Sequence, residues 1–409
     1  MIHTDASRDA ADTQLARFVL HAGADYARHR NTDNGPSNRQ HVSTLSPWLR
    51  HRCLLEDDVL AAVLAEHTPA SASAFVQEVF WRGYFRGHLE HRPSLWTRYC
   101  TERDAAWAHA QSDTSLQRRL DTARRGETGI ACFDHWAHEL IANGYLHNHA
   151  RMWFASIWIF TLELPWTLGA DFFLTHLLDG DPASNTCSWR WVAGLHTKGK
   201  VYAARSDNIA TFTNGRFPHT PGLASDASPL EESPLPPVVA PAIEADATLA
   251  SPCRLGVLIV ESDCQAESLT LPSTPCSVLT LTNPCQRAVE ALSEPAAEFT
   301  RLALIDASER AAKAFGVHAN TDANSHWETA IRAWIATEQL DVVAVARPPV
   351  GWVHDRLQPV LAAIEDTGIC VTRITRPHDR VVWPHSAKGF FKLKKQIPSI
   401  LANLNLPTS

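Results

Sequence analysis

The sequence lacks any apolar run long enough to cross a bilayer as a helix. Its longest such run, residues 152–162, falls well short of the roughly 20 residues that a transmembrane helix needs. The first ten residues contain acidic side chains, where a secretory signal would have a basic region followed by an apolar one. We therefore expect a protein of the cytoplasm without a membrane-spanning part.

The sequence also lacks the cysteine pairs of a disulfide scaffold or a zinc knuckle. Its nine cysteines are odd in number, scattered, and include no C-x-x-C pair. His147 and His149 are two residues apart, but no third ligand follows at a suitable spacing, so we predict no metal site. Neither a G-x-G-x-x-G nor a P-loop motif is present, which leaves a dinucleotide fingerprint and an NTPase loop unsupported.

The sequence has no excess of basic residues. The formal net charge of −7 argues against a protein that coats nucleic acid without specificity, although a local basic face stays compatible with it. A chain of 409 residues predicts two or three domains, and 45% hydrophobic with 20% charged residues is ordinary for a globular protein. Fourteen tryptophans are many, and they call for a reason beyond packing.

The stretch 144–194 is strongly apolar and still contains polar and charged residues. Side chains of this kind in a buried helix must be hydrogen-bonded or paired, because a lone buried charge or amide costs several kcal/mol. The polar residues in question are Asn148, Arg151, Asp179, Asp181 and Asn185. The pattern alone fits two structures equally well, a satisfied core helix followed by an acidic turn, or a cofactor site.

Spacing places part of this set on one helix face. Asn148, Arg151 and Met152 recur at three and four residues, and the other faces of this helix are apolar. Gly180 and Pro182 then predict a break, after which Trp189 and Trp191 place two aromatic residues two positions apart.

Three motifs in this stretch resemble the flavin-binding half of the DNA photolyase and cryptochrome family. They are H-N-x-x-R-M at 147–152, D-G-D-x-A-x-N at 179–185 and W-x-W at 189–191. Further partial matches are Y-x-x-x-R-N at 26–31, the serine-rich loop at 42–49, E-x-x-W-R at 78–82 and G-x-T-G at 126–129. The resemblance covers the first half of the chain and weakens after Trp191. Residues 197–202 and 206–217 stand where most relatives have a proline-aromatic segment, and the family's closing helices are expected to be absent.

The resemblance implies an FAD cofactor and a set of residues that bind it. The loop before the helix that begins at Ser46-Pro47 would hold the pyrophosphate, as free N–H groups at a helix start can do. Val42 departs from the family by lacking a hydroxyl. The implied cofactor-binding residues are Tyr26, Ser43, Thr44, Leu45, Ser46, Arg82, Asn148, Arg151, Asp179, Gly180, Asp181 and Asn185.

The resemblance also assigns roles in light-driven electron transfer. Arg151, partnered by Asp179, would stabilise negative charge on the reduced flavin, and the neutral amide of Asn185 would face the flavin ring. Trp189, Trp166 and Trp107 match the family's electron-transfer chain from flavin to surface. Together with Glu78 and Asn185, they form the predicted catalytic set.

A DNA-lesion pocket is the last implied site. Two aromatic walls suit a flipped-out pair of pyrimidines, and a carboxylic acid can hydrogen-bond the charge that develops on it. The matching residues are Glu78, Trp81, Asn148, His149, Met152 and Trp191, with His149 standing where the family has arginine. The expected partner is UV-damaged DNA, single-stranded or with the dimer flipped out.

Two alternatives to repair remain open: a cryptochrome-like photoreceptor without repair activity, and a flavin-bearing structural relic. For the helix at 75–85, a plain Glu78–Arg82 surface pair is the alternative to a site.

The second half predicts a different architecture. Residues 218–252, rich in Pro, Ala, Ser and acids, predict a solvated linker between a helical domain, 1–217, and an α/β domain, 253–409. Strands are expected at 255–261, 277–282, 301–306, 342–346 and 370–374, with helices at 327–338 and 356–366, in a small doubly wound, Rossmann-like sheet. Residues 341–401, ending on 389–394, resemble the closing half of the family's antenna domain. The two family domains are therefore expected in swapped order, with an antenna chromophore whose identity the sequence leaves open.

Overall fold

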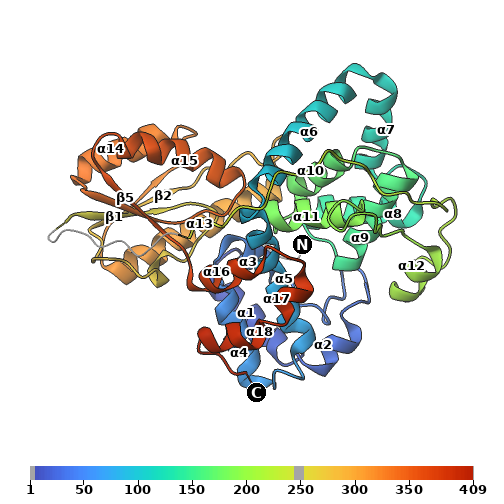
Figure 1. The fold of residues 1–409 in the computed structure, drawn as a ribbon, viewed down its shortest axis with the longest axis horizontal. Coiled ribbons are helices and arrows are strands. Elements are labelled where there is room, and N and C mark those ends of the chain that lie inside the picture. The colour runs from blue at the N-terminus through green and yellow to red at the C-terminus, as the bar shows by residue number, and fades with distance from the viewer. Residues whose placement is uncertain (1–4, 244–252, 409) are drawn as a thin grey trace.

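The computed structural model describes residues 5–243 and 253–408, and it places a helical part before a part built on a sheet (Figure 1). This order and both fold types agree with the sequence analysis. The helices of the first part are α1 Arg8–Val19, α2 Ala24–His29, α3 Ser46–His51, α4 Glu56–Glu66, α5 Ser73–Glu90, α6 Pro93–Ser112, α7 Thr114–Arg125, α8 Ala131–Asn143, α9 Asn148–Ser156, α10 Trp166–His176, α11 Pro182–Val192 and α12 Ser206–Phe212. None of the helices in the described ranges combines the length and apolar character needed to cross a bilayer.

The predicted helix start at Ser46-Pro47 is confirmed. Pro47 lies in the first turn of α3, and the Asp181 side chain caps α11 by accepting a hydrogen bond from the Ser184 backbone N–H at 2.8 Å. The helix α9 continues into a π-helical turn, Ile157–Thr161, whose first three residues are buried. Asn148 departs from the expectation of burial, because it lies exposed at the first position of α9.

The second part is a five-stranded, fully parallel sheet in the order β3-β2-β1-β4-β5. The register pairs Val257 of β1 with Val278 of β2 on one side and with Ala344 of β4 on the other. Helix α13 packs on one face, and α14 and α15 pack on the other, so the sheet is doubly wound as predicted. The elements are β1 Leu255–Ile259, β2 Ser277–Leu281, α13 Glu294–Phe315, β3 Ala319–Asp322, α14 Trp327–Glu338, β4 Val342–Ala346, α15 Trp352–Glu365 and β5 Cys370–Ile374.

One predicted strand is wrong. Residues 301–306 lie inside α13, and the third strand is β3 instead. The apolar residues around this run recur at helical spacing, since Phe299, Ala303 and Ala307 are buried along one stripe of α13. The sequence of β3 has no apolar run because this edge strand leaves its side chains partly exposed.

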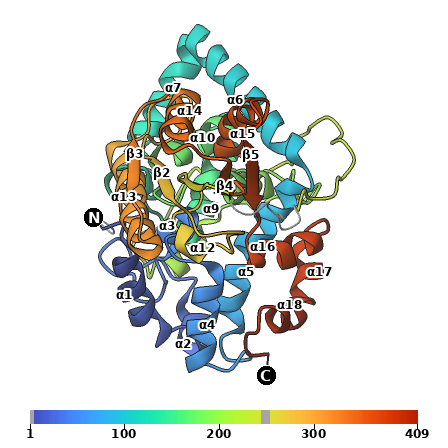
Figure 2. The ribbon, with the colours of Figure 1, turned by 90° about the vertical axis from the view of Figure 1, so that its left-hand side faces the viewer.

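After β5 the chain returns to the helical part and packs against α5 (Figures 1 and 2). This return contains α16 Pro377–Val382, a short 3-10 turn, α17 Phe390–Lys394 and α18 Ile397–Asn403, so residues 389–394 are not the last element as expected. Two glycines of α5 permit the close approach. A Cβ on Gly83 would come within 3.1 Å of the His378 ring, and one on Gly87 within 2.6 Å of Ser386 Oγ.

The described part of the expected linker, residues 218–243, contains no helix or strand and is mostly exposed, as predicted. Single residues of this segment nevertheless contact the helical part. Glu232 forms an ion pair with Arg190 at 2.5 Å, and Val239 exchanges hydrogen bonds with His91. Residues 244–252 of the predicted linker lie outside the described residues.

Buried ion pairs join the two parts. Arg50 of α3 pairs with Glu261 after β1 at 2.5 Å, Arg347 pairs with Glu90 at 2.7 Å, and all four side chains are almost fully buried. Breaking one partner of such a pair leaves an uncompensated charge, which costs about 3–5 kcal/mol. The sheet and the helices therefore form one packed unit.

Candidate functional site

The predicted pair of Arg151 and Asp179 is present at the centre of the helical part. Nη2 of Arg151 donates to Oδ2 of Asp179 at 2.8 Å, and Nε of Arg151 donates to the Leu146 carbonyl at 3.0 Å. Burial alone would raise the pKa of Asp179, but the charge of Arg151 lowers it below its ordinary value. The other carboxylate oxygen, Oδ1, is buried without a hydrogen-bond partner among the described residues.

Arg82 approaches the same place from α5. Its guanidinium lies 3.3 Å from the Ser46 carbonyl and 3.5 Å from Asp181, both longer than typical charge-assisted bonds. Burial and the neighbouring charge of Arg86 lower the pKa of Arg82. A buried cation held by such long contacts is one that an anionic ligand would stabilise.

The remaining residues of the acidic turn are engaged by the protein itself. Asp181 accepts from Arg86 at 3.2 Å as well as capping α11, and the Gly180 carbonyl accepts from Nε of Arg50 at 2.9 Å. Asn185 is buried, and its Nδ2 donates to the Ala170 carbonyl at 2.8 Å, which fixes the orientation of its amide. Asp181 therefore stabilises the start of α11 and its contact with α5, and its role in cofactor binding stays a prediction.

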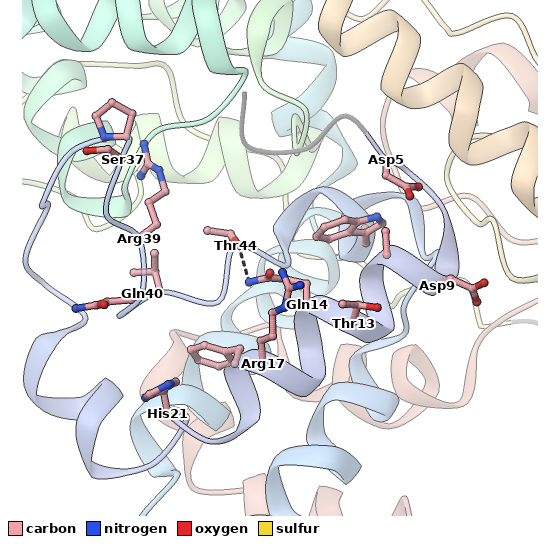
Figure 3. A pocket seen from close by; sticks show the side chains of 15 residues that line it. Asp5, Asp9, Thr13, Gln14, Arg17, His21, Ser37, Arg39, Gln40 and Thr44 are labelled. Carbon is pink, nitrogen blue, oxygen red and sulfur yellow. Dashed lines mark hydrogen bonds between the residues drawn. The ribbon is translucent and has the colours of Figure 1, made fainter.

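A cavity of about 800 Å³ lies beside the serine-rich loop (Figure 3). Thr44 faces Gln14 of α1, whose Nε2 donates to Thr44 Oγ1 at 3.1 Å and to the Ser43 carbonyl at 2.9 Å. Thr44 has a φ of 51°, in the left-handed region that a β-branched residue rarely adopts. Leu45 is fully buried behind the loop. The loop is thus held in a strained conformation from its α1 side.

The sequence analysis missed Arg39 and Tyr145, which lie between this loop and Arg151. Arg39 is paired with Glu139, and its guanidinium lies 4.5 Å from the centroid of the Tyr145 ring; the Arg151 guanidinium lies 5.3 Å from the same centroid. Nε and Nη1 of Arg39 are buried without a hydrogen-bond partner in the described part of the chain. No sequence signal could have found this pair, because Arg39 and Glu139 are 100 residues apart.

Tyr26 is buried among aromatic residues of α1 and α5. Its ring packs edge-on against Phe18 and Phe75, with centroids 5.7 and 5.2 Å away. Arg30 lies near the same ring and forms an ion pair with Glu78. Glu78 is therefore occupied by Arg30, and the Glu78–Arg82 surface pair is not among the ion pairs of the described residues.

The set Arg39, Arg82, Arg151 and Asp179 fits an anionic cofactor. Native proteins rarely bury polar atoms without partners, yet Asp179 and Arg39 both do so here, and Arg82 has only long contacts. Fixed guanidinium groups supply hydrogen-bond donors to phosphate or to an anionic ring. The unmet hydrogen bonds and the positive charge are what a bound flavin nucleotide would satisfy.

The predicted lesion-pocket residues are arranged differently. Trp81 stacks on Phe390 of α17, with ring centroids 3.7 Å apart and an interplanar angle of 11°. Trp191 is 36% exposed and stacks on Tyr202 at 5.4 Å. One face of each predicted wall is therefore covered by an aromatic residue of this chain.

The α9 residues of the predicted pocket differ in how far they are exposed. Asn148 is exposed, Met152 is partly buried, and the His149 ring stacks on Phe212 of α12 with centroids 5.5 Å apart. Burial, followed by the charge of Arg30, lowers the pKa of His149 to about 4. His149 is consequently neutral at pH 7 and does not replace the charge of the arginine it stands for. The helix α12 that covers it lies in the segment where closing helices were expected to be absent.

The three predicted electron-transfer tryptophans lie in different surroundings. Trp189 is buried against Trp158 and Phe173, with centroids 6.4 and 5.1 Å away. Trp166 contacts Tyr99 at 5.8 Å, and Trp107 lies under the Arg124 guanidinium at 5.6 Å. Among the ring contacts of the described residues none joins two of the three directly, so their order as a chain stays a prediction.

Comparison with known proteins finds similarity in the helical part. Residues 75–215 match the family model described as the FAD binding domain of DNA photolyase. The chain is 32% identical over 164 residues to a deoxyribodipyrimidine photo-lyase of Alkalihalophilus pseudofirmus, covering 39% of this chain and 33% of the relative. It is 29% identical over 171 residues to a DASH cryptochrome, chloroplastic/mitochondrial, of Solanum lycopersicum, covering 41% of this chain and 29% of the relative.

Among solved structures, a bacterial class III photolyase from Agrobacterium tumefaciens matches at 26% identity with a TM-score of 0.43. The match covers 51% of this chain and 43% of that one. The chain thus spans less than half the length of each of these three proteins.

Proposed function

We propose that this chain, whose residues 75–215 match the family model of the FAD binding domain of DNA photolyase, is an FAD-dependent, light-driven electron-transfer protein that splits cyclobutane pyrimidine dimers in DNA. When bound, FAD supplies the light-absorbing group and the transferable electron. The remaining chemistry falls to residues of this chain, which bind, orient and shield the site.

The Arg151–Asp179 pair is the observation that carries the proposal. It places a permanently charged guanidinium beside a carboxylate with one free oxygen, next to Arg82 and the Ser43 to Ser46 loop. Arg151 supplies positive charge to an anionic ring, and Asp179 fixes the orientation of Arg151 while its free oxygen accepts a hydrogen bond from the ligand. Ser43, Thr44 and Ser46 line the loop that would receive the phosphates.

Asn185 contributes a neutral amide whose Nδ2 is fixed by the Ala170 carbonyl. An amide can accept or donate a hydrogen bond but does not readily release a proton. Placed beside the flavin, it would leave the negative charge on the ring in place, which suits electron donation to a substrate.

A cryptochrome-like photoreceptor is the second candidate, and one observation favours it. Phe390 stacks on one face of Trp81, so that face is not open to a base. A protein that only senses light does not need an open Trp81 ring, whereas a repair enzyme would need one for a dimer to stack on.

Light-dependent loss of dimers from UV-treated single-stranded DNA tests the first candidate. The purified protein, loaded with FAD and photoreduced, is expected to remove dimers in blue light and not in the dark. A protein that binds FAD and reduces it in light, yet leaves dimer content unchanged over many hours, would move the assignment to the photoreceptor.

A further inference from the structure

Basic residues are concentrated at the C-terminal end of an otherwise acidic chain. The net charge of the whole protein is −7, but residues 380–409 contain five basic side chains and no Asp or Glu. The chain has only seven lysines, and four of them, Lys388, Lys392, Lys394 and Lys395, fall within eight residues. This stretch, 388–395, is called the lysine segment below.

The fold directs the lysine segment outward. Phe390 and Leu393 are buried against the helical part, and all four lysines are exposed. Phe391 is 75% exposed, the highest exposure among the large apolar side chains of the described residues. None of the ion pairs in the described ranges involves one of these lysines. An unpaired cationic surface with a bare aromatic ring in its middle therefore faces solvent.

Neighbouring acids do not neutralise this surface. Asp379, the last acidic residue of the chain, is buried in a 2.7 Å pair with Arg52. Asp57 of α4 pairs with His378 at 2.7 Å. The carboxylates of Asp379 and Asp57, which meet the return segment at α16, are thus already paired with other side chains.

A second pair of lysines lies close to the same place. Lys198 and Lys200 are exposed in the turn that follows His196. The ring of Tyr84 is contacted by His196, at 6.2 Å between centroids, and by Phe390, at 5.6 Å. Six of the seven lysines in the sequence therefore belong to two segments that are anchored on one tyrosine, which itself contacts Trp81 at 5.4 Å.

We propose that the lysine segment, together with Lys198 and Lys200, is a binding surface for the sugar-phosphate backbone of single-stranded DNA, on which Phe391 stacks a base. Lysines gain affinity by releasing counterions from phosphates, and aromatic rings stack on any base without reading its identity. This combination is typical of sequence-independent single-strand binding. The inference extends the proposed function, because it names the surface that holds the strand next to Trp81.

The surface is tested with undamaged oligo-dT in the dark, by fluorescence anisotropy at several salt concentrations. The triple variant K392Q/K394Q/K395Q is compared with R118Q/R301Q/K313Q, which removes the same charge from exposed positions on α7 and α13. We expect the first variant to bind about tenfold to a hundredfold more weakly at 0.1 M salt, with the slope of log K against log salt smaller by about 2. The control variant is expected to bind like the wild type.

Phe391→Ala separates stacking from charge. It is expected to weaken oligo-dT binding about fivefold to a hundredfold and to leave the salt slope unchanged. Circular dichroism and FAD content, recorded for every variant, show whether each one is folded.

Three outcomes would overturn the inference: a wild type that does not bind oligo-dT at low salt, equal binding by the two triple variants, or tighter binding to phosphatidylserine vesicles than to DNA. The assay needs neither light nor a dimer, so its outcome is independent of repair. Loss of dimer splitting with intact oligo-dT binding would refute the proposed function alone.

Discussion

The residues proposed to bind FAD (the flavin side below) and those proposed to bind a DNA lesion (the DNA side below) differ in the contacts that they make. On the flavin side, Asp179 and Arg39 bury atoms without partners among the described residues, and Arg82 has only long contacts. On the DNA side, Trp81 is stacked on Phe390 and Glu78 is paired with Arg30, while Nδ1 of His149 is the buried atom that lacks a partner in the described part of the chain. A ligand of the flavin side would mainly complete unmet hydrogen bonds, whereas a ligand of the DNA side would have to displace contacts that Trp81 and Glu78 already make.

The largest effect is expected where the flavin side is broken. Arg151→Ala removes the counter-charge of the buried Asp179 carboxylate and a charged donor to the ligand, and a hydrogen bond to a charged group contributes about 1.5–3 kcal/mol. FAD affinity is expected to fall about tenfold to a hundredfold. Flavin content after purification and titration with FAD measure this, with Arg118→Ala as the control. Normal flavin content in the Arg151 variant would show that the flavin lies elsewhere.

The DNA side is expected to respond to two substitutions in opposite directions. Trp81→Ala removes a stacking wall and should weaken binding to dimer-containing DNA about tenfold to a hundredfold, with little effect on undamaged DNA. Phe390→Ala uncovers the same ring and should strengthen that binding. Affinities at matched salt measure both, and Phe315→Ala, on α13, is the control. If neither substitution changes the preference for damaged DNA, Trp81 is packing alone.

A smaller effect is expected on electron transfer through the flavin side. Trp189→Phe should retain FAD but slow its blue-light reduction in the presence of an external donor, because phenylalanine is harder to oxidise. Trp136→Phe is a matched control, since Trp136 is also buried with an indole N–H that lacks a partner in the described residues. Transient absorption measures both rates. Equal rates for the two variants would remove Trp189 from the electron-transfer chain.

The smallest effect concerns the segment that covers the DNA side. Burial lowers the pKa of His378, but the hydrogen bond and charge of Asp57, with the charges of Glu56 and Asp379, raise it above 6.5 overall. Protonated His378 therefore stabilises the folded state. This contribution is fully present below pH 6.5 and is lost as the pH rises through the raised folded-state pKa of His378. Residues 377–403 are therefore expected to show more amide protection at pH 6 than at pH 8. In Asp57→Asn the difference between pH 6 and pH 8 in the free energy of local opening, measured by amide exchange, should shrink by about 1 kcal/mol. An unchanged difference would exclude His378 as its source.

Much of the fold could be predicted from local patterns. The strand at 342–346 and the helix at 327–338 match the structure at both ends, because a continuous apolar run and a three-and-four spacing each specify their own element. The strand expected at 301–306 was wrong, since a short apolar run reads the same in a strand as in a buried stripe of helix. The true third strand, β3, is an edge strand without an apolar signal.

Local sequence predicted the alternation of strands and helices, and the order of the motifs indicated the pairing of Arg151 with Asp179, because these depend on residues close in the chain or on a known motif order. Three contacts follow from tertiary packing alone: Phe390 stacks on Trp81, Glu232 pairs with Arg190, and Arg52 pairs with Asp379 across 327 residues. Such contacts depend on how segments distant in the sequence pack together. A buried charge or an uncovered ring face pairs with the partner that this packing brings within reach, and local residue spacing does not predict which partner that is.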